Sequence, residues 1–571
     1  MTNSPIITDT FSNLMSSCIS FYEKNKTEAN IERIREKRAK LSVFAEAFHK
    51  DAGTLTASVQ KKLADLKNGN SIVLMTAHQP NFFAYSGVLR KATLNFVLAK
   101  KLEELLEIPV VNFFGIADQD FTDDRWVRSC HLPAVQRNIG VLSIEVKLPE
   151  KLLLNKVAKP SRDLLEKWRT AVEVWLYETV SSVRRLCVKE GFSTSSIVTS
   201  LSDLHKNFNF VWNVVEACHE RSNRYSDFNA FLMSKIVNDV WGYDTVFSRF
   251  SDCQQIFADE FSFLLSRFMD YSRLLNEAQQ IQQCGSESSG MSDQEPLMLP
   301  FWYHCDCGSK AKLFYREKNG SLFGEGNCVG CGKYYELTLG AESDLNASGV
   351  ASRISARAIP MLLVFFNGLM PSCYVGGVGG IRYLIKARHV SGGLEIPFPP
   401  VAVWRPRDKY LGVGQLEAKL ELMRICKSLG AQNLSEAKKI LGLRITAIRK
   451  RIRKFGRVKE KLAEELRENP HNEELKERLK EALMNQTNFL RNSKLSVFSR
   501  ELKLLENVST ILDLIPSILD YSVNIGLKET SDYWIWHLDK HGSLSTDVYL
   551  DSVLSQHMKL DKTLPRGVLS E

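Results

Sequence analysis

Apolar and polar residues follow one another near the start of the chain in a pattern that predicts a strand, a helix and a second strand. Residues 20–68 are polar with helical spacing, and residues 71–76 form an apolar run that is typical of a buried strand and ends in the turn AHQPN. A helical pattern begins near Gly87, and its apolar face carries Leu94, Leu98, Leu102 and Leu105. Residues 108–114 supply the second apolar strand. A strand, a helix and a strand within about forty residues predict parallel pairing through a right-handed crossover.

The same core is interrupted and then resumed further along the chain. Residues 136–285 have mostly helical spacing and close in the polar tract CGSESSGMSDQEP (284–296), which is typical of a linker. After a compact cysteine-rich piece at 300–338, residues 352–407 return to glycine-rich turns and apolar runs, of which 361–366 is expected to be a strand. We therefore expect one α/β domain with a parallel-sheet core, which is interrupted by a helical insertion and then resumed.

The last third of the chain carries a heptad pattern. The a and d positions are Ile445, Ile448, Ile452, Phe455, Leu462 and Leu466, with Lys459 in place of an apolar residue. The segment ENPHNEE breaks this helix, and Leu475, Leu479 and Leu483 begin a return arm. This pattern predicts an antiparallel coiled-coil hairpin, and the lysine in its seam indicates that the hairpin needs further partners.

Composition narrows the class of protein. The 571 residues are 44% hydrophobic and 25% charged, which is ordinary for a globular chain of several folding units. The N-terminus shows no signal-peptide pattern, and the apolar run from Ile359 to Phe366 is too short to cross a bilayer. Eight of the 12 cysteines are scattered singly. We expect a protein of a reducing, cytoplasmic compartment without a membrane segment.

Four cysteines are organised as two pairs. Cys305 and Cys307 are followed after a twenty-residue gap by Cys328 and Cys331, with glycines beside both pairs. Such knuckles can close a tetrahedral Zn²⁺ site, and a closed four-thiolate site has a structural role because it leaves no position for water or substrate. Four free core cysteines would explain neither the pairing nor the glycines, and His304 is an alternative ligand.

Three further segments carry candidate chemistry. His78, Gln79 and Asn81 follow the first strand, where open α/β sheets bind ligands, although a lone histidine there is more often structural. After the second strand come Asp118, Asp120, Asp123 and Asp124, which could bind Mg²⁺, an amine or hydroxyls, act as a base, or form a solvated loop with Asp123 capping a helix. The third segment is a glycine-rich turn with Tyr374, Gly376, Gly377 and Gly379, preceded by Arg357 and followed by Trp404, Arg405 and Arg407.

The net charge of +9 arises largely in one stretch, residues 444–459, which hold eight Lys or Arg and no acid. This stretch and a zinc ribbon would also suit a nucleic-acid-binding or scaffold protein on a degenerate enzyme core. However, the basic run shares its helix with the heptad, and Phe455 is the aromatic residue within it. The pattern therefore argues against nucleic acid as the partner.

The predicted units follow from these patterns. They are an N-terminal helical segment packing on the core (1–70), the first half of the core (71–135), a helical connecting insertion (136–299), a zinc ribbon (300–345), the second half of the core (346–410), a helical coiled coil (411–540) and a C-terminal tail without an assigned role (541–571).

Four separated blocks resemble the bacillithiol synthase family, in the family's order. These blocks are TAHQP (76–80), IADQDF (116–121), ISARAIP (354–360) and CYVGGVGG (373–380). The chain departs from the family pattern at Ala77, His78, Val378 and Gly380, the acidic segment is two residues shorter, and the zinc ribbon is an addition. A second, shorter resemblance is HQPNFFAYSG (78–87), which is similar to the opening of the WbqC-like family of sugar-pathway transferases.

The first resemblance implies a Rossmann-like core with insertions, a homodimer through the coiled coil, and a ligase that joins the carboxyl of cysteine to the amino group of a glucosaminyl-malate-like acceptor. Because amide formation from a carboxylate is unfavourable in water, we hypothesise that ATP, with Mg²⁺, activates the carboxyl. In that picture His78, Asp118 and Asp120 are catalytic. The binding residues are Gln79, Asn81, Arg357, Tyr374, Gly376, Gly377 and Gly379, and Cys305, Cys307, Cys328 and Cys331 hold Zn²⁺. An amide ligase or transferase acting on another amine or sugar is the alternative.

Overall fold

A parallel sheet lies at the centre of the computed structural model, which describes residues 6–191, 195–283, 297–341, 346–405 and 408–558. The sheet has six strands in the order β1-β13-β12-β2-β3-β6, and each neighbouring pair is parallel. The strands are β1 (Ile6–Ile7), β2 (Ile72–His78), β3 (Val110–Ile116), β6 (Val246–Arg249), β12 (Cys373–Gly376) and β13 (Val401–Val403). The expected α/β class with a parallel sheet is confirmed.

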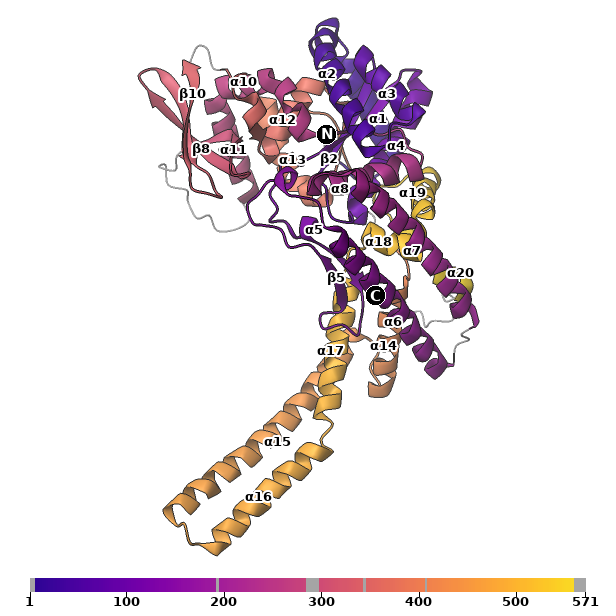
Figure 1. Ribbon diagram of the computed structural model, residues 1–571, viewed down its shortest axis with the longest axis vertical. Helices are drawn as coiled ribbons and strands as arrows, with labels where there is room; N and C mark the ends of the chain where they lie inside the picture. Colours follow the sequence, from indigo (N-terminus) through magenta and orange to yellow (C-terminus); the bar gives the residue numbers. More distant parts are fainter. Residues whose placement is uncertain (1–5, 192–194, 284–296, 342–345, 406–407, 559–571) are drawn as a thin grey trace.

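Helices cover both faces of the sheet, which is why its strands are apolar at nearly every position (Figure 1). In β2, Ile72 and Leu74 face one core, and Val73 and Met75 face the other. The first core includes α4 (Ser86–Leu106) and α19 (Leu527–His541), and the second includes α3 (Ala57–Asn68) and α12 (Ala358–Leu369). The crossover from β2 through α4 to β3 is the unit expected from the sequence.

Both edge strands of the sheet come from segments outside the expected core. The N-terminal segment contains α1 (Phe11–Asn25) and α2 (Glu28–Ala52), and also β1, which pairs with β13. The insertion supplies β6 on the opposite edge, next to β3. The insertion, expected at 136–299, is therefore not purely helical, and it also contains β5 (Val141–Glu145), which forms a hairpin with β4 (Ser129–Pro133) just before the insertion begins.

The remaining elements of the insertion are helical. Its α-helices are α6 (Arg162–Glu190), α7 (Ser195–Arg221), α8 (Tyr225–Ser234), α9 (Phe250–Cys253), α10 (Ala258–Ser266) and α11 (Phe268–Gln283), and the short α5 (Arg125–Arg128) precedes it. The tract 284–296, interpreted as a linker, lies outside the described residues, as does Arg407.

A second, antiparallel sheet contains the cysteine-rich segment. Its five strands run in the order β10-β9-β8-β7-β11. They are β7 (Met298–His304), β8 (Lys310–Lys318), β9 (Ser321–Asn327), β10 (Tyr334–Ala341) and β11 (Ile354–Ala356). Because α12 begins two residues after β11 ends, this sheet, called here the cysteine sheet, is anchored directly to the second half of the core.

The prediction of a strand at 361–366 is wrong, since these residues lie in α12. Pro360 stands in the first turn of this helix, where a missing N–H costs no hydrogen bond. The helix is apolar on nearly every side because both the sheet and the helices beyond it cover it. A short, fully buried apolar run lacks the periodicity that would separate a helix from a strand.

The C-terminal third begins with α13 (Ile381–Gly393) and α14 (Val413–Leu429). Next, α15 (Leu434–Glu468) and α16 (Glu473–Asn492) lie side by side and project from the body as an arm (Figure 1). Phe455 and Phe489 meet between them with ring centroids 5.5 Å apart. A coiled coil in the strict sense, with knobs packed into holes, stays a prediction.

The chain then returns to the body. The returning elements are α17 (Leu495–Leu512), α18 (Ile518–Asn524), α19, β15 (Val548–Tyr549) and α20 (Val553–Met558), and β15 pairs with β14 (Asp408–Lys409). The first part of the segment expected to be a tail is therefore packed on the body. Among the residues that the structure describes, no helix combines the length and the apolar composition that crossing a bilayer requires.

Candidate functional site

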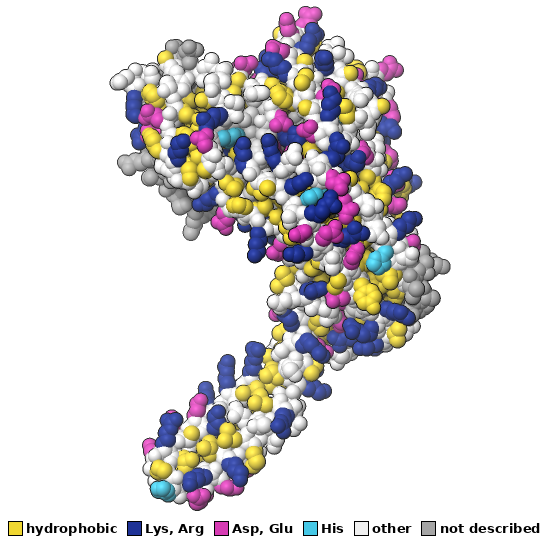
Figure 2. All heavy atoms as spheres, in the orientation of Figure 1, with side chains coloured by type: hydrophobic (Ala, Val, Ile, Leu, Met, Phe, Trp, Pro, Cys, Tyr) yellow, Lys and Arg dark blue, Asp and Glu magenta, His cyan; other side chains and the backbone are white. Residues whose placement is uncertain are grey.

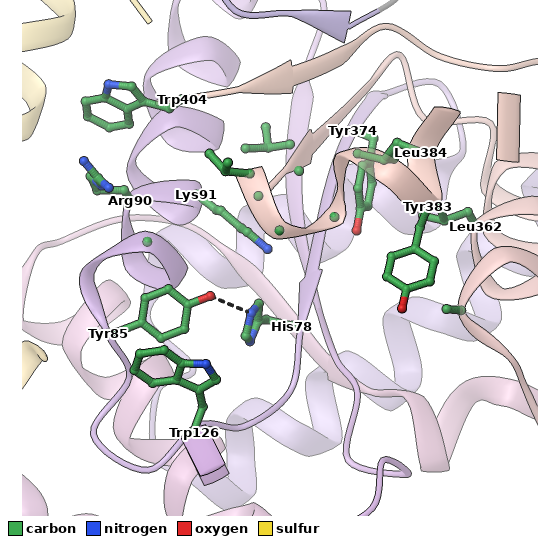
Figure 3. Close-up of a pocket in the computed structure, with 18 of the residues that line it drawn as sticks. His78, Tyr85, Arg90, Lys91, Trp126, Leu362, Tyr374, Tyr383, Leu384 and Trp404 are labelled. Carbon is green, nitrogen blue, oxygen red and sulfur yellow. Dashed lines mark hydrogen bonds between the residues drawn. The ribbon is translucent and has the colours of Figure 1, made fainter. Parts of the chain in front are cut away.

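The strand order reverses direction between β2 and β12, and a cavity of about 580 Å³ opens at their carboxyl ends (Figure 3). From β2 the chain moves through β3 to β6, whereas from β12 it moves to β13 on the other side. Ligands of open α/β sheets bind at such reversal points. The volume suits a small molecule. We call this space the loop cavity, because the glycine-rich turn 376–380 forms one wall.

The glycine-rich turn joins β12 to α13. Gly376 ends the strand, and a tight turn at Val378–Gly380 leads into the helix, so the N-terminus of α13 faces the cavity. A Cβ on Gly377 would lie 3.3 Å from Cε of Lys91, so the absent side chain lets the lysine pass close beneath the turn. Free backbone N–H groups at a helix N-terminus favour an anion.

Lys91 projects from α4 into the loop cavity, beneath the turn and toward His78 (Figure 3). Its side chain is buried, and burial lowers the pKa of its ammonium group to about 8. Nζ donates to the carbonyl oxygen of Ala77 at 3.3 Å. Throughout the described chain, no carboxylate lies within ion-pair distance of it. At neutral pH Lys91 is therefore a buried cation without a counter-charge.

His78 stands at the end of β2, in the wall shared by the loop cavity and its neighbour. Burial and the nearby Lys91 charge lower the pKa of His78 to about 3, so the ring is neutral at physiological pH. Nδ1 lies 3.1 Å from the carbonyl oxygen of Gln79 and must donate to it, which leaves Nε2 to accept from the Tyr85 hydroxyl at 3.4 Å. This neutral ring favours hydrogen bonding over proton transfer.

A second cavity of about 430 Å³ adjoins the first and lies against the cysteine sheet. Its lining includes Gln79, Asp120, Trp302, Lys310 and Arg357, and it shares His78, Tyr85 and Gly379 with the loop cavity. We call it the ribbon cavity. Burial lowers the pKa of Lys310 to about 8 and also lowers the pKa of Arg357.

The acidic segment after β3 divides between the cavity and the interior. Asp120 lines the ribbon cavity, whereas Asp118 is fully buried and accepts hydrogen bonds from the backbone N–H and the hydroxyl of Ser251. Burial raises the pKa of Asp118 to about 6. The helix cap expected at Asp123 is formed by Asp124, whose Oδ1 accepts from Trp126 N at 2.8 Å. Asp123 instead pairs with Arg128 at 3.5 Å.

Most of the other predicted binding residues line a cavity, but one of them is buried outside both. Tyr374, Gly376, Gly377 and Gly379 line the loop cavity, and Trp404 lies on its rim at the end of β13. Asn81 is buried outside the lining of both cavities. The segments near 78, 357 and 376 therefore line two adjoining cavities, with His78 in the wall that both share, and Asp118 lies in the interior behind them.

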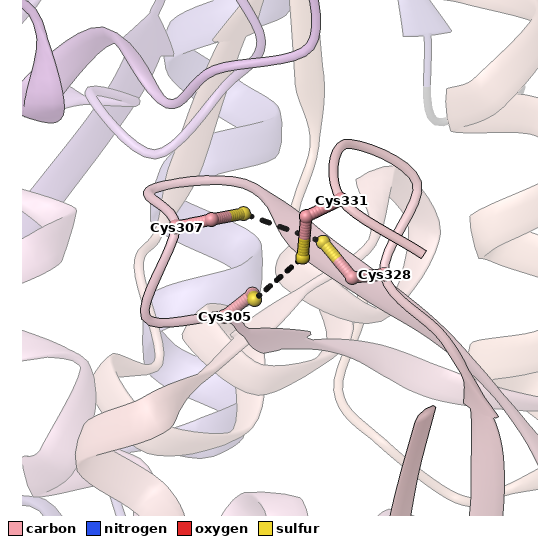
Figure 4. Close-up of side chains that lie close together, drawn as sticks. All are labelled: Cys305, Cys307, Cys328 and Cys331. Atoms are coloured by element: carbon pink, nitrogen blue, oxygen red, sulfur yellow. Dashed lines mark hydrogen bonds between the residues drawn. The ribbon is translucent and has the colours of Figure 1, made fainter. Parts of the chain in front are cut away.

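The four cysteines meet at one end of the cysteine sheet, in the turns β7–β8 and β9–β10 (Figure 4). Sγ of Cys305 is 3.5 Å from Cys331, Sγ of Cys307 is 3.6 Å from Cys328, and all four sulfurs lie within 4.8 Å of one another. Tetrahedral zinc with Zn–S bonds of about 2.3 Å separates its sulfurs by about 3.8 Å. The cluster therefore fits one Zn²⁺.

Backbone turns support this cluster without His304. Gly308 and Gly332 adopt the left-handed conformation in the two turns, and their N–H groups donate to the carbonyl oxygens of Cys305 and Cys328. Nε2 of His304 lies 2.9 Å from the Ser355 hydroxyl and outside the sulfur cluster. Four cysteines are the candidate ligand set.

Sequence reasoning found Arg357 but missed the two lysines of the site. Lys91 and Lys310 belong to no motif, and each looks like an ordinary surface lysine until the fold buries it. Tyr85 and Trp126, whose rings are 4.7 Å apart in the wall that both cavities share, were also missed. The sequence did offer one signal for Lys91, which is its position near the start of α4. The first turns of a helix that follows a parallel strand lie at the edge of the sheet where ligands bind.

Comparisons with known proteins leave the family open. No family model matches the chain, and no curated protein matches it. Among solved structures, one described as a "putative arginyl T-RNA synthetase" from Campylobacter jejuni has 11% identity and a TM-score of 0.22, with 87% of this chain and 98% of that chain covered. A match at this level transfers neither fold nor activity.

Proposed function

We propose that this protein is a carbon–nitrogen ligase that activates a carboxylate in the loop cavity and joins it to an amine. The observation that carries the proposal is the convergence, at the reversal point of a parallel sheet, of a glycine-rich turn, the N-terminus of α13 and the buried Lys91 cation. All of these favour an anion. Following the resemblance to bacillithiol synthases, the substrates are cysteine, or a similar amino acid, and a glucosaminyl-malate-like amine.

Activation is required because a carboxylate does not form an amide in water at useful rates. In the proposed reaction the carboxylate attacks the α-phosphorus of ATP, forming an acyl adenylate and releasing pyrophosphate with its Mg²⁺. The amine then attacks the acyl carbon, and AMP leaves as the amide bond forms and the amine loses a proton. Lys91 and the turn 376–380 would stabilise the phosphoryl charge that grows in both steps.

The remaining residues hold the partners of this reaction. Asp120 lines the ribbon cavity, where its carboxylate would bind the acceptor's ammonium group and take up its proton. His78 would donate no proton, since its ring is neutral, and would orient a hydroxyl or amine through hydrogen bonds. Zn²⁺ on the four cysteines would fix the cysteine sheet, which forms the far wall of the ribbon cavity.

A direct assay tests the proposal. Purified protein is incubated with ATP, Mg²⁺, cysteine and glucosaminyl-malate, and AMP release and the amide product are measured by mass spectrometry. We expect Lys91→Met to lower kcat/KM at least 100-fold, because it removes charge stabilisation from the transition state. Lys100→Met, on the outer side of α4, should leave the rate within about twofold. Absence of amine-dependent AMP release with any amino acid would refute the ligase proposal.

A further inference from the structure

Lys310 is a buried cation that the proposed chemistry does not use. It opens β8, its side chain is only 4% exposed, and its ammonium lies 5.0 Å from the ring centre of Phe121 and 6.0 Å from that of Trp302. In the described part of the chain, no acceptor lies within hydrogen-bond distance of Nζ and no carboxylate within ion-pair distance. A buried ammonium without a partner is costly, so a function that requires its charge is the expected reason for it.

Arg357 lies on the same side of the site. As the N-cap of α12 it lines the ribbon cavity with Lys310, and its guanidinium lies 5.7 Å from the Trp302 ring centre. Among the described residues no carboxylate pairs with it either. Two cations therefore lie near the Trp302 ring, and both line one cavity. Asp120 in the same lining is near enough to act on the charge of Lys310 but not to form an ion pair.

These cations are separate from the Lys91 group. Lys91 lines the loop cavity, and Lys310 and Arg357 line the ribbon cavity, with His78 and Tyr85 in the wall between them. The two groups also come from different parts of the fold. Lys91 stands on a core helix, whereas Lys310 stands on the cysteine sheet and Arg357 at its junction with α12.

We propose that Lys310 and Arg357 form a second anion-binding subsite, which holds a carboxylate or phosphate group of the substrate that does not occupy the loop cavity. Arginine can hold such a group through two parallel N–H bonds while the lysine supplies a point charge. The cysteine sheet is then part of the binding site as well as a structural attachment. The assignment of the subsite to the amine substrate rests on the proposed ligase function, but the subsite itself does not.

Titration calorimetry on the full chain tests the subsite without catalysis. The probes are inorganic phosphate and succinate, and the variants are Lys310→Met and Arg357→Met. Lys312→Met is the matched control, because Lys312 lies on the same strand, outside both cavities, with its ammonium over Phe314. We expect each subsite variant to weaken at least one probe tenfold or more and the control to stay within twofold. The probe with the larger loss identifies the subsite as one for carboxylate or for phosphate.

Two results would overturn the subsite: wild-type protein that binds neither probe, or Lys310→Met and Arg357→Met proteins that bind both as the wild type does. Far-ultraviolet circular dichroism checks folding, and if one variant is unfolded the other decides. The two proposals fail separately. If the wild type binds a probe, the two subsite variants lose that binding, and no ligase activity is found, the ligase proposal is refuted and the subsite stands. If the wild type is an active ligase but the variants bind both probes as it does, the subsite is refuted and the ligase proposal stands.

Discussion

In and directly behind the two cavities, burial shifts the pKa of ionisable side chains more than neighbouring charges do. Burial is the leading cause of the shifted pKa of Lys91, Lys310, Asp118 and His78, which lie in or directly behind the site. Such a cluster of perturbed groups is typical of a functional site. Burial of these groups also lowers the stability of the folded state, because each charged form is less stable inside the protein than in water.

Asp118 offers a test of this cost. Its pKa is about 6 in the folded chain, against an ordinary value of 3.8, so between these values the folded state binds more protons and stability falls as pH rises. Above pH 6 the full penalty applies, up to about 3 kcal/mol. Asp118→Asn should therefore raise the melting temperature at pH 8, and the gain should vanish at pH 4.

The control for this prediction is Asp123→Asn, because Asp123 is an exposed carboxylate in the same segment. Calorimetric scans at several pH values should show no comparable gain for it. A lower melting temperature for Asp118→Asn than for the wild type at pH 8 would contradict the buried-charge account. It would show that the hydrogen bonds from Ser251 to the charged carboxylate outweigh desolvation.

At the scale of elements, the cysteine sheet has the clearest chemical requirement. It is a small antiparallel sheet at the side of the core, and one end of it is defined by four sulfurs rather than by apolar side chains. Small units of this kind usually need a metal to order their turns. Because Trp302 and Lys310 stand on its first two strands, disorder in this sheet would also disturb the ribbon cavity.

We predict one zinc ion per chain, measured by plasma mass spectrometry on protein purified without added metal. Cys328→Ser should lose most of the zinc, while Cys426→Ser, which alters a cysteine outside the cluster, should keep it. Hydrogen exchange should then show faster exchange in β8 and β9 of the Cys328→Ser protein and unchanged protection in β2 and β3. Metal-free wild-type protein with full protection in β8 and β9 would contradict a structural metal.

The whole molecule consists of a compact body and a projecting, highly charged arm that also exposes several large apolar side chains. Leu443, Leu483, Met484 and Leu490 are each between 44% and 64% exposed, and Figure 2 shows apolar side chains along the arm. Charge is also divided along the arm: residues 444–459 hold eight cations and no acid, and residues 460–481 hold eight acids and five cations. If two arms packed antiparallel, the acid-rich segment 460–481 of each arm would lie against the basic segment 444–459 of the other.

We therefore predict a homodimer through the arm. Light scattering should give twice the chain mass of 64.8 kDa, and added salt should weaken the dimer by screening its charges. Arg449, Lys450 and Arg453 changed together to Glu should yield monomers. The same change at Lys40, Lys50 and Lys61 on the body should not. A monomeric mass for the wild type at micromolar concentration would refute arm-mediated dimerisation.

The sequence by itself determined the features that depend on neighbours along the chain. Periodicity was sufficient for β2, α4 and β3, and spacing was sufficient for the paired cysteines, because side-chain direction in regular elements and in short turns follows from local geometry. The placement of a ligand crevice after β2 also followed, since the ends of parallel strands share one edge.

Only the tertiary structure decided the rest. Strands β1 and β6 span two and four residues, too few to show a period, and α12 is buried all round, so its amphipathic signal is weak. Lys91, Lys310 and Arg357 came to line two adjoining cavities because folding brought their elements together, and the same packing buried the two lysines and placed Asp118 behind the cavities. Burial depends on residues that are distant in the chain, and no local pattern records it.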